Sequence, residues 1–357
     1  MSRPRAILSA PPAPRSPWQK FYGAVHRLRR SWHHQRAFRL PRPVISIGNL
    51  SWGGSGKTPM TAAVAERLRD QGYRVAILSR GYGRKDEKEV RLISDGEGPM
   101  LGPLLAGDEP VLLAGMLPGV AVAVGADRAH AGNHLLNRLD KPPDVFILDD
   151  GFSHLQLYRD LDLLLFPAAD PFAGGRLPPS GKLREPLASS SRADAVLLTG
   201  AGADELSHVG DELAHALRPH GFQGPGFGSQ TVIHPPRRVL AGNTPGDANP
   251  ELDRGERLLL VSGIARPEPF AAAVREMGFD IADHLVFADH HAYPASSLEQ
   301  INQAFQQQGA TTVLATAKDR VKLHMRLKLP LAELPLRAEP VEPFWDWLRE
   351  RLAELKT

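Results

Sequence analysis

A glycine-rich stretch that follows an apolar run constrains this chain most. Residues 44–59 are Val-Ile-Ser-Ile-Gly-Asn-Leu-Ser-Trp-Gly-Gly-Ser-Gly-Lys-Thr-Pro. The apolar start predicts a buried strand, and the apolar spacing over residues 62–68 predicts a helix. A strand, a glycine-rich turn and a helix in this order are typical of a loop that binds nucleotide phosphates.

The side chains of this loop have the chemistry that phosphate binding needs. Its glycines, at positions 53, 54 and 56, lack Cβ atoms, so the turn can direct backbone N–H groups at an anion. Lys57 can reach the β- and γ-phosphates, and Thr58 can ligate Mg²⁺. Ser51 stands where the strict phosphate-loop pattern has its first glycine. A glycine-rich loop without a ligand is the alternative, and the flanking strand and helix favour phosphate binding.

Composition excludes several classes of protein. The 357 residues include no cysteine, so disulfides, thiol catalysis and cysteine metal sites are excluded. Residues 1–42 hold ten of the 43 Lys and Arg and no acid, which leaves 33 basic and 40 acidic residues, a net charge of −7, for the rest of the chain. The positive charge is therefore local to the N-terminus, and we expect no nucleic-acid partner.

The N-terminal region divides into two parts. Residues 1–16 are rich in proline and have no apolar core, so we expect a disordered leader and not a signal peptide. Residues 17–39 place aromatic and aliphatic side chains at helical spacing among several arginines, as in a helix that lies on an anionic membrane. Packing of this stripe on the protein's own core is the alternative, and an arm that binds nucleic acid is less favoured.

Apolar runs alternate with helical patterns along the chain, which predicts a parallel sheet covered by helices. We expect an α/β fold: a P-loop NTPase-type parallel sheet with helices on both faces over residues 40–229, and a smaller C-terminal α/β domain over residues 230–357. Residues 218–256 are interpreted as a connection with a possible strand at 231–240. The expected strands are 44–47, 75–78, 120–124, 145–148, 161–166, 195–198, 258–263, 281–287 and 312–316, and the expected helices are 58–70, 126–138, 203–217, 267–277, 296–307 and 343–355.

Acidic residues follow two of the expected strands. Asp149 and Asp150 end an apolar run, where a phosphate-binding fold holds Mg²⁺; a solvated acidic turn is the alternative. Asp127 follows another expected strand, and its sequence is equally compatible with a general base and with the N-cap of a helix.

Two polar stretches follow expected strands of the second domain. His290 and His291 can hold a proton near neutral pH, but adjacent residues on an extended chain point apart, so one shared metal is not expected. A surface turn is the alternative. Lys318 and Asp319 stand in a stretch similar to the base-reading loop of GTPases, with the lysine one position too late, so guanine recognition is disfavoured.

Seven motifs together resemble one family, the tetraacyldisaccharide 4'-kinases of lipid A biosynthesis. They stand in the family's order over residues 17–355, and Ser51 agrees with the hydroxyl residue of that family. The motifs are residues 48–59, 79–83, 125–128, 149–154, 183–187, 287–293 and 316–319.

The resemblance implies a kinase that uses ATP and Mg²⁺ to phosphorylate the 4'-hydroxyl of a tetraacyldisaccharide 1-phosphate lipid, giving lipid IV-A. It implies a monomer docked by its N-terminal helix on the cytoplasmic face of the bacterial inner membrane. It also implies roles for single residues. Asp127 and His290 match a dyad that activates the sugar hydroxyl; Thr58, Asp149 and Asp150 match the metal side; Asn49, Arg80 and Tyr82 match the substrate side; and the nucleotide side comprises Ser51, Trp52, Gly53, Gly54, Ser55, Gly56, Lys57, Thr58, Arg184, Glu185, Lys318 and Asp319.

The chain departs from the family at two positions: Ser153 stands where glutamine is common, and Ala317 where glutamate is common. The departure at Ser153 affects the geometry beside the metal, and the departure at Ala317 affects recognition of the nucleotide base. Two other classes remain open from the residues alone: a GTPase or ATPase that acts as a switch or chaperone, and an inactive nucleotide-binding scaffold. The phosphate-loop lysine and the carboxylates weaken the second, and a requirement for a lipid acceptor would separate the first from a kinase.

Overall fold

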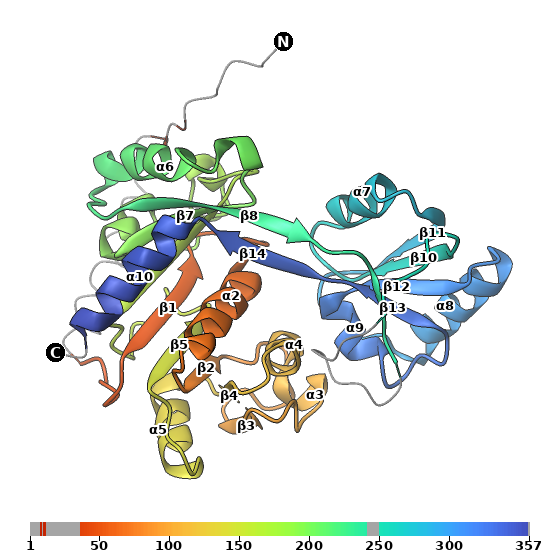
Figure 1. The fold of residues 1–357 in the computed structure, drawn as a ribbon, viewed down its shortest axis with the longest axis horizontal. Helices are drawn as coiled ribbons and strands as arrows, with labels where there is room; N and C mark the ends of the chain where they lie inside the picture. The colour runs from red at the N-terminus through yellow and green to blue at the C-terminus, as the bar shows by residue number, and fades with distance from the viewer. Residues whose placement is uncertain (1–7, 9, 12–35, 241–249, 356–357) are drawn as a thin grey trace. The chain divides into compact units, whose positions relative to one another are not determined.

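The computed structural model describes residues 8, 10–11, 36–240 and 250–355. The chain divides into two compact units that are interleaved along the sequence (Figure 1). The first unit comprises Met1–Arg80, Asp127–Thr231 and Ala338–Thr357, and the second comprises Gly81–Ala126 and Val232–Arg337. The sequence predicts two consecutive domains with a boundary after residue 229, whereas residues 81–126 belong with the C-terminal segment and the last helix belongs with the N-terminal one.

A parallel sheet forms the centre of the first unit (Figure 1). Its strands stand in the order β8-β7-β6-β1-β5-β2, each pair of neighbours is parallel, and β14 follows beside β8. All residues of β1, β2, β5 and β7 are buried, as expected for strands covered on both faces. The bounds are β1 Val44–Asn49, β2 Val75–Ser79, β5 Val145–Asp149, β6 Leu161–Pro167, β7 Ala195–Thr199, β8 Gly226–Ile233 and β14 Leu336–Pro340.

Both faces of this sheet are covered. Leu164 and Val196 pack in one apolar cluster with Leu213 of helix α6. Leu163 and Leu197 point to the opposite face, because side chains alternate along a strand, and they are buried as well. Helix α2 contacts β1, β2 and β5, and α5 contacts β2. The helices of this unit are α2 Lys57–Asp70, α5 Arg128–Arg138, α6 Val209–Leu217 and α10 Glu342–Glu354.

The second unit contains a smaller five-stranded sheet in the order β11-β10-β12-β13-β9. β9 is antiparallel to its neighbour and the other pairs are parallel. Leu258 and Leu260 pack with Phe270 of α7, and the alternate residues Leu259 and Val261 belong to a second cluster that includes α8. The bounds are β9 Arg237–Arg238, β10 Arg257–Ser262, α7 Glu268–Glu276, β11 Asp280–Val286, α8 Ala295–Gln307, β12 Thr312–Thr316, α9 Ala317–Leu323 and β13 Leu331–Leu334.

An inserted segment completes the second unit. β3, Arg91–Ser94, pairs with β4, Ala121–Val124, in antiparallel fashion, and helices α3, Pro103–Ala106, and α4, Asp108–Met116, lie between them in the chain. Helix α4 packs against α9, which follows β12. The segment thereby brings the start of α4 to the loops that end the strands of the smaller sheet.

The expected strands and helices are confirmed to within a few residues, with two exceptions. The expected helix 203–217 is a 3₁₀ turn at Ala203–Glu205 followed by α6. The possible strand 231–240 is wrong, since β8 ends at Ile233 and joins the large sheet, and Pro235 and Pro236, which have no N–H, separate it from β9. The sequence did not predict β3, α3, α4, α9, β13 or β14.

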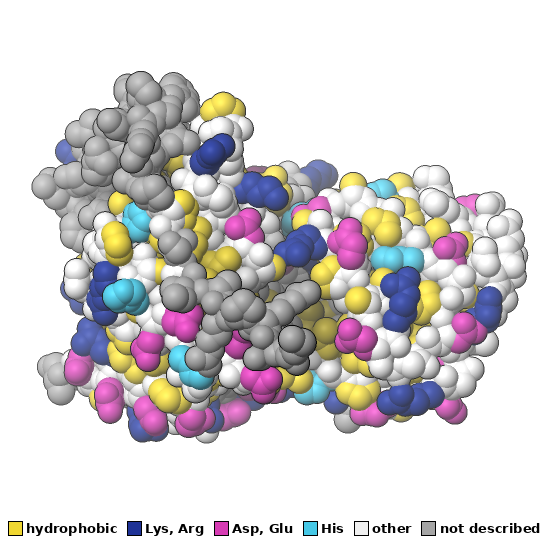
Figure 2. All heavy atoms as spheres, turned by 90° about the horizontal axis from the view of Figure 1, so that it is seen from above, with side chains coloured by type: hydrophobic (Ala, Val, Ile, Leu, Met, Phe, Trp, Pro, Cys, Tyr) yellow, Lys and Arg dark blue, Asp and Glu magenta, His cyan; other side chains and the backbone are white. Residues whose placement is uncertain are grey.

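The predicted leader and docking helix lie almost wholly outside the described residues. Phe38, near the end of the predicted helix, instead forms a bridge with Leu157, and its N–H donates to the carbonyl of Gln156 at 2.9 Å. On the face in Figure 2, Lys and Arg side chains are interspersed with Asp and Glu, without a continuous basic area over the described residues. Within the described part, no helix is both long enough and apolar enough to cross a membrane.

Candidate active site

The glycine-rich loop connects β1 to α2 in the first unit, as predicted. Gly53 has a φ of 118° and Gly56 a φ of 74°, a backbone conformation that glycine adopts without strain. Gly56 is the N-cap of α2, and glycine has no side chain that could bond to the first N–H groups of the helix. These groups and the helix dipole make the start of α2 suitable for an anion.

Neighbouring segments fix the course of this loop. Ser51 forms a bridge with Leu183, and the N–H of Arg184 donates to the carbonyl of Leu50 at 2.6 Å. On the other side, the Thr199 hydroxyl donates to the carbonyl of Ser55 at 3.0 Å. The structure therefore brings the predicted Arg184 beside the predicted phosphate loop, although the two are far apart in the sequence.

Lys57 lies between an amide and a carboxylate. Its Nζ donates to Asn49 Oδ1 at 3.3 Å and is 3.8 Å from Asp150 Oδ1. The Asn49 amide in turn donates to the carbonyl of Ser51 at 2.8 Å. Three residues that the resemblance assigns to the substrate, nucleotide and metal sides thus meet at the end of β1.

The two carboxylates at the end of β5 differ in their surroundings. Asp149 is buried and accepts hydrogen bonds from the hydroxyls of Thr61, at 3.1 Å, and Ser79, at 3.4 Å. Asp150 has a positive φ of 53°, and Arg184 donates to its Oδ2 at 3.0 Å. Burial would raise the pKa of Asp150, but Lys57 and Arg184 lower it below its ordinary value, so this carboxyl is ionised at neutral pH.

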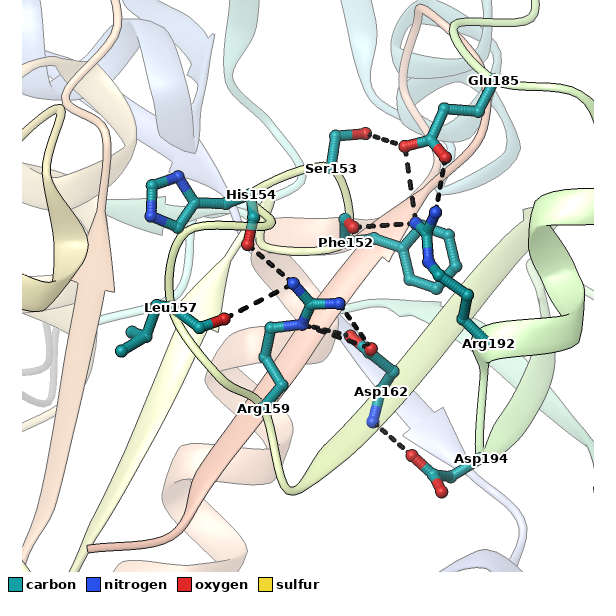
Figure 3. A network of polar contacts seen from close by, with 9 residues as sticks. All are labelled: Phe152, Ser153, His154, Leu157, Arg159, Asp162, Glu185, Arg192 and Asp194. Carbon is teal, nitrogen blue, oxygen red and sulfur yellow. Dashed lines mark hydrogen bonds and ion pairs between the residues drawn. The ribbon is translucent and has the colours of Figure 1, made fainter. Parts of the chain in front are cut away.

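The turn after these carboxylates is held by two arginines, shown in Figure 3. Arg192 donates to the carbonyl of Phe152 at 2.9 Å and stacks over its ring, and Arg159 donates to the carbonyl of His154 at 2.7 Å. Arg159 is itself paired with Asp162. The backbone of residues 152–154 is therefore fixed by side chains that the sequence analysis did not single out.

Glu185 belongs to the same network (Figure 3). Its carboxylate accepts from the Ser153 hydroxyl at 2.6 Å and from Arg192 at 2.8 Å, and the side chain is buried. Burial would raise its pKa, but Arg192 and Ser153 lower it. Ser153, which stands where the family commonly has glutamine, thus bonds to Glu185, and the resemblance-based role of Glu185 toward the nucleotide stays a prediction.

Asp127 caps helix α5, because its side chain accepts the backbone N–H of His130 at 3.0 Å. The N-cap interpretation is therefore confirmed, and the general-base interpretation stays a prediction that the cap does not exclude. The adjacent Arg128 is buried, and burial together with the charge of Arg80 lowers its pKa to about 10. Asp127, Asp149 and Asp150 oppose that shift, so these carboxylates and both arginines share one charged neighbourhood.

The second unit holds the other predicted residues. His290 Nε2 is 3.0 Å from Lys318 Nζ, and the exposed ring of Tyr82 meets the His290 ring edge to face at a centroid distance of 5.8 Å. Asp319 is fully buried and accepts from the N–H of Gly263 at 2.8 Å and from the Thr316 hydroxyl at 2.6 Å. Thr316 is the N-cap of α9 and its hydroxyl also accepts the Asp319 N–H. Base recognition by Lys318 and Asp319 stays a prediction.

Asp127 and His290 belong to different units, so the predicted dyad is not contained in either one. No group of three or more His, Asp or Glu side chains suited to a metal occurs among the described residues. A hydroxyl and two carboxylates beside a phosphate loop nevertheless fit Mg²⁺, which takes one or two carboxylates and completes its shell with phosphates and water.

A parallel sheet with a glycine loop after its central strand β1 and carboxylates at the end of the neighbouring strand defines a P-loop nucleotide-binding protein. Residues 15–353 match the family described as tetraacyldisaccharide-1-P 4'-kinase, LpxK, and the chain belongs to this family. Its activity is accordingly that of a tetraacyldisaccharide 4'-kinase, and the alternatives of a switch and a scaffold are set aside.

Individual relatives agree with the family. The chain is similar to the tetraacyldisaccharide 4'-kinases of Pelobacter propionicus, 40% identical over 94% of this chain and 91% of that protein, and of Geobacter sulfurreducens, 39% identical over 95% and 90%. Among solved structures it is similar to LpxK from Aquifex aeolicus in complex with ATP, with a TM-score of 0.71 and 29% identity over 95% of this chain and 97% of that one.

Proposed function

We propose that this chain transfers the γ-phosphoryl group of ATP to the 4'-hydroxyl of a tetraacyldisaccharide 1-phosphate lipid, giving the 1,4'-bisphosphate. The observation that carries the proposal is the glycine loop before α2, where the Lys57 ammonium contacts the side chains of Asn49 and Asp150. Family membership supports the lipid acceptor, and the ATP-bound relative supports ATP as the donor.

The first unit supplies the groups for the nucleotide. Residues 51–58 surround the phosphates with backbone N–H groups and the Lys57 ammonium, and Arg184 adds a second positive charge. Thr58, Asp149 and Asp150 are the groups that would hold Mg²⁺, which when bound neutralises charge on the phosphate oxygens. Glu185, Lys318 and Asp319 complete the predicted nucleotide side.

The acceptor hydroxyl needs a base, because its pKa in water is far above neutrality. Asp127 and His290 are proposed as the dyad that takes that proton. Arg80 and Tyr82 are proposed on the lipid side, together with Asn49.

The place of action is proposed to be the cytoplasmic face of the inner membrane, with the chain bound at the surface as a monomer. The aromatic and basic composition of residues 17–39 supports docking of this kind. The lipid acceptor supports it too, because its acyl chains keep the sugars at the interface.

A phosphoryl-transfer assay with ATP, Mg²⁺ and the lipid disaccharide tests the proposal. We expect ATP turnover to require the lipid and the Lys57→Ala variant to lose transfer, because its ammonium meets phosphate and not the apolar core. The exposed Lys141→Ala variant in the same unit is the matched control. Lipid-independent ATP turnover would favour a nucleotide switch, and near-normal transfer by Lys57→Ala would overturn the phosphate-loop assignment.

A further inference from the structure

Two segments of the first unit that are distant in the sequence meet at the end of β5. Arg184 donates to Asp150 Oδ2 at 3.0 Å, and the Ser153 hydroxyl donates to Glu185 Oε1 at 2.6 Å. Adjacent residues of the segment before β7 thus contact both ends of the turn after β5. The first contact joins opposite charges, whereas the second leaves the charge of Glu185 without a counter-charge from the turn.

Arg192 supplies that counter-charge and contacts both segments at once. Its Nη1 donates to Glu185 Oε2 at 2.8 Å, and its Nη2 donates to the carbonyl of Phe152 at 2.9 Å (Figure 3). The guanidinium carbon lies 4.0 Å from the centroid of the Phe152 ring. Because the donors of a guanidinium form a rigid, planar fork, this one group fixes the Glu185 carboxylate relative to the Phe152 carbonyl.

The backbone of Arg192 is itself tied to the large sheet. Arg192 ends a 3₁₀ turn, η2 Leu187–Arg192, shortly before β7. The carboxylate of Asp194 accepts the N–H of Asp162 at 2.7 Å, and the Asp194 N–H donates to the Asp162 carbonyl at 2.9 Å (Figure 3). Since Asp162 belongs to β6, the guanidinium extends from a fixed part of the unit toward the turn.

Burial makes these contacts necessary. The side chains of Arg192 and Glu185 are 9% and 5% exposed. Burial would raise the pKa of Glu185, but Arg192 lowers it below its ordinary value, so the carboxyl is ionised at neutral pH. Without the guanidinium, a buried charge would lose its partner and the Phe152 carbonyl would lose a donor. We therefore expect the turn to shift when the guanidinium is removed.

We propose that Arg192 is a positioning residue for phosphoryl transfer: it holds the turn after β5 against the segment that carries Arg184, and thereby keeps the two carboxylates at the end of β5 in place to receive Mg²⁺. These carboxylates, Asp149 and Asp150, stand three and two residues before the carbonyl that the guanidinium holds, so a shift of the turn moves them as well. This inference rests on the metal-side role proposed for them.

The simpler role for Arg192 is structural, because a buried ion pair that loses one partner destabilises the fold. The Mg²⁺ dependence of transfer separates the two roles. We expect Arg192→Ala to lower kcat by about 10- to 100-fold and to raise the Mg²⁺ concentration needed for half-maximal transfer, with the KM for the lipid unchanged. A structural role alone would lower the unfolding temperature and the amount of folded protein, without changing the Mg²⁺ dependence.

Arg192→Lys and Arg74→Ala are the companion variants. Lysine keeps the charge beside Glu185 but lacks the planar fork, so Arg192→Lys should recover part of the lost kcat. It also decides the question if Arg192→Ala does not fold. Arg74 donates to Asp144 at 2.9 Å, just before β2 and β5 begin, at the ends of these strands away from the turn. Arg74→Ala thus controls for the loss of an arginine–carboxylate pair and should leave kcat and the Mg²⁺ dependence unchanged.

Hydrogen exchange of the full chain without nucleotide or metal provides a readout that does not depend on activity. In the turn, the Gly151 N–H donates to the carbonyl of Ile47 at 3.0 Å, and the His154 N–H donates to that of Gly151 at 2.9 Å. Peptides from residues 149–157 should exchange faster in Arg192→Ala than in the wild type, and at the wild-type rate in Arg74→Ala. Unchanged exchange there, or a wild-type Mg²⁺ dependence, in Arg192→Ala would overturn the inference.

The failure of this inference and that of the proposed metal side can be told apart. Full transfer with an unchanged Mg²⁺ dependence in both Asp149→Asn and Asp150→Asn would overturn the metal-side role, and with it this inference. Loss of transfer in those variants, with normal kcat and Mg²⁺ dependence in Arg192→Ala, would overturn this inference alone.

Discussion

Asp127 has an observed structural contact and a predicted chemical role. Its side chain accepts the N–H of His130 and so caps α5, and it lies in the charged neighbourhood of Asp149, Asp150 and Arg128. A cap requires only an oxygen that accepts, whereas a base requires a carboxylate. Substitutions can therefore separate the two roles.

We expect Asp127→Asn to lower kcat by at least about 10²-fold, because the amide cannot accept the substrate proton. Stability should change little, since asparagine is an equally good N-cap. Asp127→Ala should lower kcat by the same factor. It should in addition lower the free energy of unfolding by about 1 kcal/mol, because the cap is removed. Steady-state kinetics and denaturant unfolding of both variants check this. Normal kcat in Asp127→Asn would restrict the residue to capping.

His154 gives a prediction for the pH dependence of stability. Burial, with the charges of Arg128 and Arg159, lowers its pKa to about 3, and its Nε2 has no hydrogen-bond partner among the described residues. An unfolded histidine binds its proton near pH 6.5. The unfolded state therefore holds more protons between about pH 6.5 and 3, and the free energy of unfolding must fall as pH falls through that window.

The slope from one such group is at most about 1.4 kcal/mol per pH unit. We expect urea unfolding between about pH 7 and 5 to show a shallower decline in His154→Asn than in the wild type, because the variant cannot titrate. His130→Asn, at an exposed position, is the control for the substitution itself. Parallel pH curves for wild type and His154→Asn would contradict the assignment.

At the scale of elements, the end of β1 and the turn after β5 depend on a close approach. A Cβ on Gly48 would lie 2.5 Å from the Cβ of Phe152, a distance at which something must move. The turn that it would displace follows directly on Asp149 and Asp150 and is held by Arg192 and Arg159. Packing between elements therefore constrains the position of the carboxylates.

We expect Gly48→Ala to lower the free energy of unfolding by about 1–3 kcal/mol, the usual range for an overpacked core. It should also reduce transfer activity, since the turn must shift. Gly102→Ala, at a position with a φ of −78° and no atom within 4 Å of the new Cβ, should leave both unchanged. Thermal unfolding and the kinase assay compare the two variants. Equal stability and equal activity would show that the close approach at Gly48 does not constrain the turn after β5.

At the scale of the whole molecule, charge is distributed unevenly along the chain. The first 42 residues carry ten positive charges, while the remainder has a net charge of −7. A negative body is repelled by an anionic membrane, so attraction would have to come from the N-terminal segment. The prediction that the protein binds an anionic membrane therefore depends on this segment.

Deletion of residues 1–39 should weaken binding to vesicles that contain anionic lipids, and binding of the full chain should fall as salt rises. Each basic residue near such a surface contributes about 1 kcal/mol. A variant with Arg29→Gln and Arg30→Gln keeps the apolar stripe and should lose only the salt-dependent part. Vesicle sedimentation measures all three proteins. Equal binding by the truncated and full chains would mean that the stripe packs on the protein itself.

The sequence alone determined the parallel sheet, the phosphate loop and the family. Strands buried on both faces are continuous apolar runs, and a phosphate loop is a local pattern of glycines, lysine and threonine, so both are visible along the chain. The order of seven motifs then sufficed for the resemblance, which the family match confirms.

Only the tertiary structure decided which distant residues act on these motifs. Arg192 on the carbonyl of Phe152, Arg184 on Asp150 and Asp108 on His290 join segments separated by 34 to more than 100 positions. In the sequence these charged residues cannot be told from ordinary surface residues, because the local sequence does not determine which partner a long side chain will meet. Burial by the surrounding elements gives each of them a specific partner, since a charge removed from water is stable only when it is paired.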